Sequence, residues 1–204
     1  MFWWLLPVSF VVSACPFESN VGLAPGPSEP VDSTLFGYWY GIIKDFSDVY
    51  GIEALEITKQ SDSVYAITRY GKAVKGDMIL PDTAYYTGFI SYLDEKRFMN
   101  IEGTATVAVY KKNKQTEYRT EKVYYLSVLD RRNDTLHVKT ITDDFSTRKI
   151  FKSPNELSQL VSASFNQQKN IYDELYALSY RKIQKPQPLK PLWVSAEKNP
   201  VCPF

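Results

Sequence analysis

Histidine and cysteine are scarce in this chain, which has one histidine and two cysteines. His137, flanked by Leu136 and Val138, falls on a predicted strand, where a lone histidine is usually hydrogen-bonded structure rather than a catalyst or ligand. Zinc, haem and Cys–His nucleophile sites need more such residues than the chain supplies. A glycine-rich phosphate-binding loop is also missing. We therefore expect a non-catalytic protein with no metal and no cofactor.

Acidic and basic clusters give weaker signals. The pair Asp143-Asp144 lies in a predicted turn, and two carboxylates can serve a glycosidase or bind calcium, but adjacent acidic residues in a turn are usually turn residues. A basic cluster is interleaved with Glu117 and Glu121, so it predicts a solvated hairpin tip and no nucleic-acid binding. Its members are Lys111, Lys112, Lys114, Arg119 and Lys122. The acidic excess of residues 16–104 and the basic excess of 105–204 predict two solvated faces.

The apolar run at the N-terminus, residues 2–14, is too short for a membrane-spanning helix, which needs roughly 20 apolar residues. A short apolar run that ends in small residues is typical of a cleaved export signal. Residues 1–14 contain no lysine or arginine, which departs from the positive start of such signals. We predict that residues 1–14 are a signal peptide.

The end of this run, Val12-Ser13-Ala14-Cys15, resembles the lipobox at which bacterial lipoprotein precursors are cut and acylated. The resemblance implies a lipid anchor on Cys15 and a protein tethered to a membrane of the cell envelope. In Gram-negative lipoproteins an aspartate after this cysteine favours the inner membrane. Since residue 16 is Pro16, the resemblance implies the outer membrane, on its periplasmic or surface face.

The alternatives to a lipid anchor are a plain secretory signal cut after Ala14 and a buried N-terminal strand. After secretion, Cys15 and Cys202, each the first residue of a Cys-Pro-Phe tripeptide, could join the two ends of the mature chain in a disulfide. If Cys15 is acylated, Cys202 is left as an odd thiol.

Residues 35 to about 150 show one short strand pattern after another. These runs favour β-branched and aromatic residues and are separated by turn residues. We predict strands at 36–43, 50–58, 64–70, 84–93, 98–110 with a break near Gly103, 118–129, 135–142 and 147–151. Strands joined by such short loops predict a mainly β, antiparallel barrel or sandwich.

One α-helix is predicted near residues 154–166. Ser153 is the expected N-cap, Pro154 the first helical residue and Glu156 part of a capping box. The apolar stripe behind it, Leu157, Leu160, Val161 and Phe165, predicts packing across one mouth or face of the sheet. A second helical turn is expected at 171–178 and a last strand at 179–183.

The predicted strands and helix form a single β-rich domain of residues 35–183, with one further segment on each side of it. Residues 15–34 are rich in proline, glycine and serine and predict a flexible, lipid-anchored linker. Residues 184–204 predict a proline-rich extended tail that packs Trp193 on the domain.

The first strand carries a second resemblance. Gly37-Tyr38-Trp39 is similar to the Gly-x-Trp motif at the start of lipocalins, in which the tryptophan closes the base of the barrel under a late arginine; Arg181 is the candidate here. A second lipocalin motif, a Thr-Asp-Tyr turn, does not occur in the chain. The resemblance implies a barrel that carries a small lipophilic ligand.

Two function classes follow. The first is a non-catalytic binding, assembly or inhibitor module that contacts an envelope protein or polymer through an exposed aromatic patch. The second is a lipocalin-like carrier whose cavity is lined by Trp39, Tyr85 and Phe89. The sequence favours the first and does not name the partner, the ligand or the oligomeric state.

The mass of the denatured protein, expressed in a Gram-negative host, tests the anchor. We expect loss of residues 1–14 and addition of acyl chains at Cys15. An unmodified Cys15 would favour the secreted form, in which Cys202 is disulfide-bonded until a reductant is added.

Overall fold

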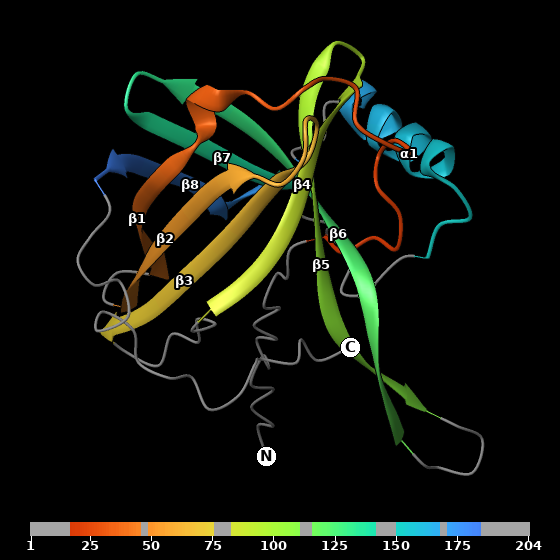
Figure 1. Cartoon of the computed structure of the whole chain (residues 1–204). Coiled ribbons are helices and arrows are strands. Elements are labelled where there is room, and N and C mark those ends of the chain that lie inside the picture. The colour runs from red at the N-terminus through yellow and green to blue at the C-terminus, as the bar shows by residue number, and fades with distance from the viewer. Residues whose placement is uncertain are drawn as a thin grey trace, which may run out of the picture.

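The chain folds as a closed antiparallel barrel of eight strands (Figure 1). The computed structural model describes residues 17–45, 49–75, 83–110, 116–141, 150–167 and 171–184. Each strand pairs with the next along the chain, and the last pairs with the first. The strands are β1 (Gly37–Asp45), β2 (Val49–Lys59), β3 (Tyr65–Lys75), β4 (Thr83–Leu93), β5 (Lys96–Tyr110), β6 (Thr116–Arg132), β7 (Thr135–Ile141) and β8 (Tyr172–Ile183). The predicted mainly β fold is confirmed, and it is a barrel.

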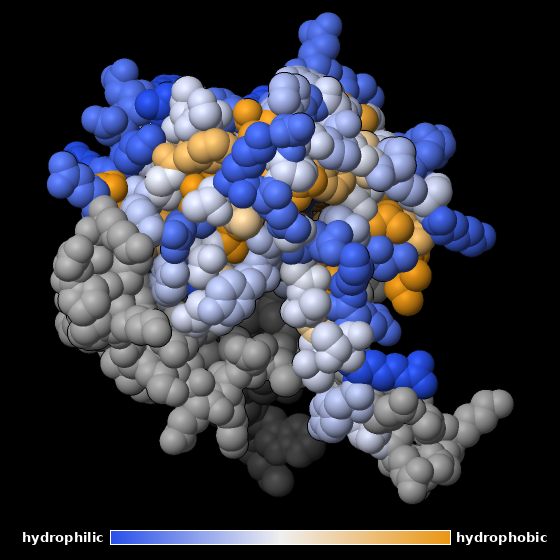
Figure 2. Space-filling model, in the orientation of Figure 1, coloured by the Kyte–Doolittle hydropathy of each residue, from blue (hydrophilic) through white to orange (hydrophobic). Residues whose placement is uncertain are grey.

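Alternation along each strand separates an interior from an outer wall, because successive side chains of a strand point to opposite faces. On β6, Tyr125, Ser127 and Leu129 line the interior, whereas Leu126 and Val128 pack on the outside. The face of the molecule seen in Figure 2 is mainly hydrophilic, with hydrophobic residues in separate patches. The buried hydrophobic residues form two clusters, one inside the barrel and one on its outer wall.

The interior cluster closes the base of the barrel. The short helix η1 (Ser33–Leu35) precedes β1 and brings Leu35 against Trp39, and both side chains are buried. The Trp39 ring nitrogen donates a hydrogen bond to the Leu35 carbonyl oxygen at 2.9 Å. Tyr65 and Ile90 complete the same apolar layer. This layer lies near the end of the barrel where β1 begins.

The outer cluster lies between the barrel wall and two segments that cover it. The helix α1 (Pro154–Asn166) buries Leu157 and Val161 there, and the segment before η1 buries Phe17 and Leu23. We call this segment, residues 17–32, the strap. Figure 1 shows α1 against the outside of the barrel and not inside it. The predicted helix and its apolar stripe are confirmed, except that Leu160 is 37% exposed.

The strap begins by completing the barrel wall. Direct pairing of β6 with β7 ends at Ser127 and Thr140. Beyond that point, the backbone of Ser19 exchanges hydrogen bonds with Tyr124 of β6, and the Phe17 amide donates to Ile141 of β7 at 3.1 Å. The start of the strap thus lies in the gap where β6 and β7 separate.

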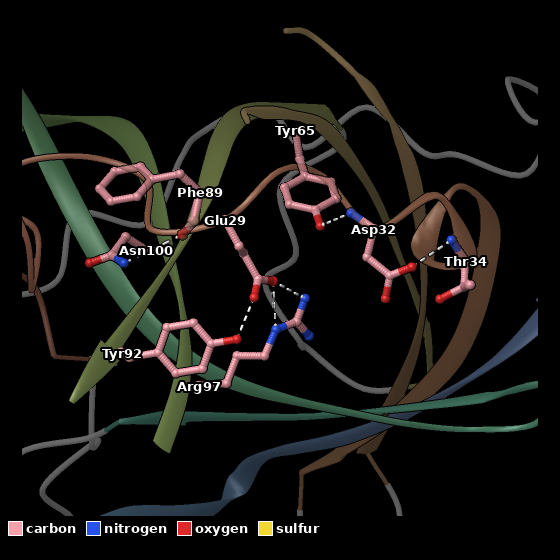
Figure 3. A network of polar contacts seen from close by, with 8 residues as sticks. All are labelled: Glu29, Asp32, Thr34, Tyr65, Phe89, Tyr92, Arg97 and Asn100. Carbon is pink, nitrogen blue, oxygen red and sulfur yellow. Dashed lines mark hydrogen bonds and ion pairs between the residues drawn. The ribbon is translucent and has the colours of Figure 1, made fainter. Parts of the chain in front are cut away.

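Polar contacts hold the rest of the strap along the wall. The Leu23 amide donates to the buried Asn100 side chain at 2.6 Å. Further on, Glu29 accepts two hydrogen bonds from Arg97, at 2.8 and 2.5 Å, and one from the Tyr92 hydroxyl (Figure 3). We expected a flexible linker at 15–34, but its described part belongs to the folded domain, because Phe17 and Leu23 are apolar anchors within a proline-rich segment.

Two other predictions are corrected by β5 and β8. The strand β5 runs through Gly103 without a break. Residues 171–178, expected to be helical, belong mostly to β8, because barrel closure needs a strand that pairs with both β7 and β1. The last strand predicted at 179–183 is confirmed as the end of β8.

Several sequence predictions lie outside the described residues. They concern the signal peptide, Cys15, Cys202, most of the tail with Trp193, the Asp143-Asp144 pair and the loop part of the basic cluster. Residues 150–151, the described end of the strand predicted at 147–151, are not in a strand. Within the described ranges, no helix combines the length and apolarity needed to cross a membrane.

The strap makes a testable contribution to stability. The variant Leu23→Ala, which removes a 4% exposed side chain, should lower the free energy of unfolding by about 2–3 kcal/mol in urea titrations. The matched variant Leu160→Ala, on a 37% exposed leucine, should cost less than about 1 kcal/mol. Equal losses would contradict the strap's role as part of the folded core.

Candidate functional site

A cavity of about 200 Å³ lies inside the barrel. Its walls come from seven strands and are mostly aliphatic, with a smaller polar group on one part of the surface. The aliphatic lining residues are Leu55, Ile57, Ile67, Met99, Ile101, Leu129, Leu136, Val138 and Leu178. The polar and aromatic ones are Glu53, Arg69, Tyr86, Tyr125, Ser127, Thr140 and Tyr180. An apolar cavity with a few convergent polar groups is the usual form of a small-molecule site.

The centre of the polar group is an ion pair between neighbouring strands. Arg69 of β3 donates to the same carboxylate oxygen of Glu53, on β2, through Nε at 2.5 Å and through Nη2. The other carboxylate oxygen accepts a hydrogen bond from the Tyr180 hydroxyl of β8. Both oxygens of Glu53 are therefore occupied, and its side chain is only 3% exposed.

Burial fixes the protonation of this group. Burial raises the pKa of Tyr180 well above its ordinary value of 10.0, and the Glu53 charge and hydrogen bond add to the effect. Burial, the largest single influence, lowers the pKa of Arg69, but the charge and hydrogen bond of Glu53, together with the nearby tyrosines Tyr86 and Tyr180, outweigh it, so the net direction is upward. At neutral pH, Tyr180 is thus a neutral donor and Arg69 a cation.

A pair of tyrosines extends the polar surface. Tyr86 of β4 and Tyr125 of β6 meet edge to face, with ring centroids 6.3 Å apart. The Tyr125 hydroxyl donates to Glu18 of the strap at 2.8 Å, so the strap reaches a residue that lines the cavity. Burial, followed by the Glu18 charge, raises the pKa of Tyr125.

Two glycines on the strands make room for the aromatic rings. A Cβ at Gly103 would lie 2.8 Å from the Tyr86 ring, and one at Gly41 would lie 2.8 Å from the Tyr180 ring. Both contacts are closer than real Cβ atoms show. The glycines therefore leave the space that an edge of each ring occupies next to the wall.

The base of the barrel corrects the arginine assignment. The side chain above the Trp39 ring is Lys182, with its ammonium nitrogen 5.2 Å from the ring centroid. Lys182 stands opposite Trp39 in the β1–β8 register, whereas Arg181 pairs with Tyr40 and is exposed. The expected cation over tryptophan is present, but one residue later, because adjacent strand residues face opposite sides.

The three predicted cavity residues are not the ones that line it. Trp39 is buried below the cavity in the base layer. Tyr85 is 75% exposed on the outer face, and Phe89 also lies on the outer side of β4, next to Gly22 of the strap. The inward set of β4 starts at Tyr86, so the prediction was out of register by one residue for Tyr85 and Phe89.

Sequence reasoning missed Glu53 and Arg69, although a signal was present. Glu53 is in phase with Leu55 and Ile57 on β2, and Arg69 is in phase with Tyr65 and Ile67 on β3. A charged residue in phase with an apolar face is a candidate for a buried pair. His137 is as predicted, since its Nδ1 lies 2.8 Å from the Ser179 hydroxyl oxygen in a structural hydrogen bond.

In the described part of the chain, no three His, Cys, Asp or Glu side chains are grouped so that they could hold a metal ion. No family model, no curated protein and no solved structure matches this chain.

Alkaline pH should destabilise the protein through its buried tyrosines. A tyrosine whose pKa is raised by folding contributes stability below the unfolded value of 10.0, and that stability is lost as pH rises above it. We expect the unfolding free energy, measured in urea between about pH 8 and pH 11, to fall less steeply in Tyr180→Phe than in the parent. Equal slopes would contradict the protected state of the Tyr180 hydroxyl.

The Glu53–Arg69 pair should show strong coupling in a double-mutant cycle. Arg69→Met alone leaves a buried carboxylate without its counter-ion and should lower the unfolding free energy by roughly 3 kcal/mol. The double variant Glu53→Gln/Arg69→Met should be closer to the parent, since no buried charge remains. Additive losses in urea denaturation would show that the two side chains do not act as a pair.

Proposed function

We propose that this protein is a carrier that holds a small, mainly apolar molecule inside its barrel. The observation that supports the proposal is the internal cavity, which combines aliphatic walls with a buried Glu53–Arg69–Tyr180 group. Eight strands enclose an interior that side chains can fill, or that can hold one small ligand. Here the interior is only partly filled, and its volume is below the ~300–1,000 Å³ of drug-sized sites. The cargo is correspondingly small.

Stability alone does not account for the polar group. A buried ion pair usually stabilises a fold no better than apolar residues of similar volume. The Arg69 side chain also keeps 29% exposure although Glu53 beside it keeps 3%, because Arg69 faces the cavity. A cation that faces an apolar cavity is better explained by a cargo with a polar atom than by packing.

We further propose that the carrier works at a membrane of the cell envelope, tethered through Cys15. The proposal rests on the lipobox-like Val12-Ser13-Ala14-Cys15. A lipophilic molecule dissolves poorly in water, so a membrane tether places the carrier next to the phase that holds its cargo.

The module that binds an envelope protein or polymer stays a prediction with less support. It calls for a patch of exposed aromatic residues. The exposed tyrosines among the described residues are Tyr85 and Tyr92, near opposite ends of β4, and Tyr118, near the start of β6. These side chains lie on two strands, β4 and β6, that are not neighbours in the sheet.

Native mass spectrometry of the purified protein tests the carrier function. We expect extra mass that is lost on denaturation, and we expect Val138→Trp, which fills the cavity, to abolish it. Ile42→Trp, at a residue that is 55% exposed, is the matched control and should retain the extra mass. A well-folded parent protein that never shows bound mass, even after incubation with lipophilic extracts, would refute the proposal.

A further inference from the structure

The polar groups that face the cavity differ in how much of their hydrogen-bonding capacity is used. Both oxygens of Glu53 already accept hydrogen bonds, one of them twice from Arg69 and the other from Tyr180. Ser127 and Thr140 bond to each other at 2.9 Å. The Tyr125 hydroxyl is used by Glu18. Each of these groups therefore has at least one hydrogen-bond partner among the described residues.

Two groups on adjacent strands keep free donors. A guanidinium has donors on three nitrogens, and Arg69 uses only Nε and Nη2, so the donors of Nη1 have no partner in the described part of the chain. The Tyr86 hydroxyl likewise makes no hydrogen bond with a described residue. Both side chains line the cavity, and Tyr86 lies close enough to Arg69 to influence its pKa. These donors are therefore available to an acceptor atom of a ligand in the cavity.

The charges around the cavity indicate which kind of hydrogen-bond acceptor the ligand carries. The positive charge of Arg69 is already neutralised by Glu53, and Glu18 adds a negative charge behind Tyr125. An anionic ligand would therefore bring an uncompensated negative charge into a low-dielectric cavity. A cationic ligand would be repelled by Arg69 and would compete with Arg69 and Tyr180 for the oxygens of Glu53. A neutral oxygen acceptor avoids both costs.

We propose that the cargo is an uncharged, mainly hydrocarbon molecule whose carbonyl-type oxygen accepts hydrogen bonds from Arg69 Nη1 and the Tyr86 hydroxyl. Ketones, esters and amides share this chemistry. The aliphatic side of the cavity takes the hydrocarbon part, and an edge of the Tyr86 ring occupies the space that a side chain at residue 103 would fill. The inference rests on the carrier function proposed above and specifies its ligand class.

Three probes with the same eight-carbon chain test the ligand class: octan-2-one, octanoate and octylamine. Calorimetry with the purified mature protein at neutral pH should show octan-2-one binding at least about tenfold more tightly than either charged probe. Tighter binding of octanoate or octylamine would overturn the ligand class and leave the carrier function standing. If none of the three binds and native mass spectrometry finds no cargo, the carrier function itself fails.

Two adjacent tyrosines on opposite faces of β4 give a matched pair of variants. Tyr86→Phe removes one proposed donor and should weaken octan-2-one binding about five- to tenfold. Tyr85→Phe, on the outer face, should leave the affinity unchanged. Equal affinities in the two variants would exclude Tyr86 as a ligand contact and overturn the proposal.

A charge variant provides a second readout. Glu53→Gln leaves the Arg69 charge uncompensated, so affinity for octanoate relative to octan-2-one should rise at least about tenfold. Circular dichroism checks that the variant is folded. An unchanged ratio in a folded Glu53→Gln protein would show that Arg69 does not face the ligand and would overturn the proposal. If Glu53→Gln does not fold, the tyrosine pair still decides.

Discussion

Closure of the sheet between β1 and β8 is the constraint on which the rest of the structure depends. The paired residues are few, Tyr38 to Tyr40 against Arg181 to Ile183, and the contact is strengthened where Lys182 covers the Trp39 ring. An open sheet of the same strands would leave two edges with unpaired backbone groups. Closure satisfies those groups and encloses an interior at the same time, so the cavity exists because the sheet has no edge.

The interior combines two demands that usually conflict. An apolar core stabilises the barrel, while a buried ion pair has a desolvation cost that the attraction between its charges only partly offsets. The protein limits this cost by supplying both oxygens of Glu53 with donors from β3 and β8. It leaves part of Arg69 and Tyr86 unsaturated on the cavity side. The polar group thus connects three strands of the wall, β2, β3 and β8. It also makes one part of the cavity surface polar while the rest is mostly aliphatic.

The sequence predicts the fold class well because the signals for it are local. Alternation, turn residues and the Ser153-Pro154 cap each act within a few residues, so seven strands and α1 were found at nearly their observed positions. Residues 171–178 were assigned to a helix because their pairing with β7 and β1 is determined by distant residues. The strap was missed for the same reason, since Phe17 and Leu23 are anchors only when the outer wall is already formed.

The candidate site was predicted less well because it depends on which face of each strand points inward. An error of one residue exchanges the two faces, as Tyr85 and Tyr86 show. The in-phase position of Glu53 and Arg69 within apolar strands was visible in the sequence, but their pairing across β2 and β3 was not. The Trp39 base was predicted from a short motif, and only the register identified Lys182 as its partner.

The order of the strands also affects how the chain folds. Strand β1 is made first and its closing partner β8 last, so the ring cannot form until almost the whole described chain is available. Until then β1 and β7 are both exposed edges, and contacts between distant parts of a chain form slowly. The gap between β6 and β7 is also filled from the start of the chain, by Phe17 and Ser19. Folding intermediates should therefore be open sheets that are prone to self-association until β8 joins β1 and removes both edges.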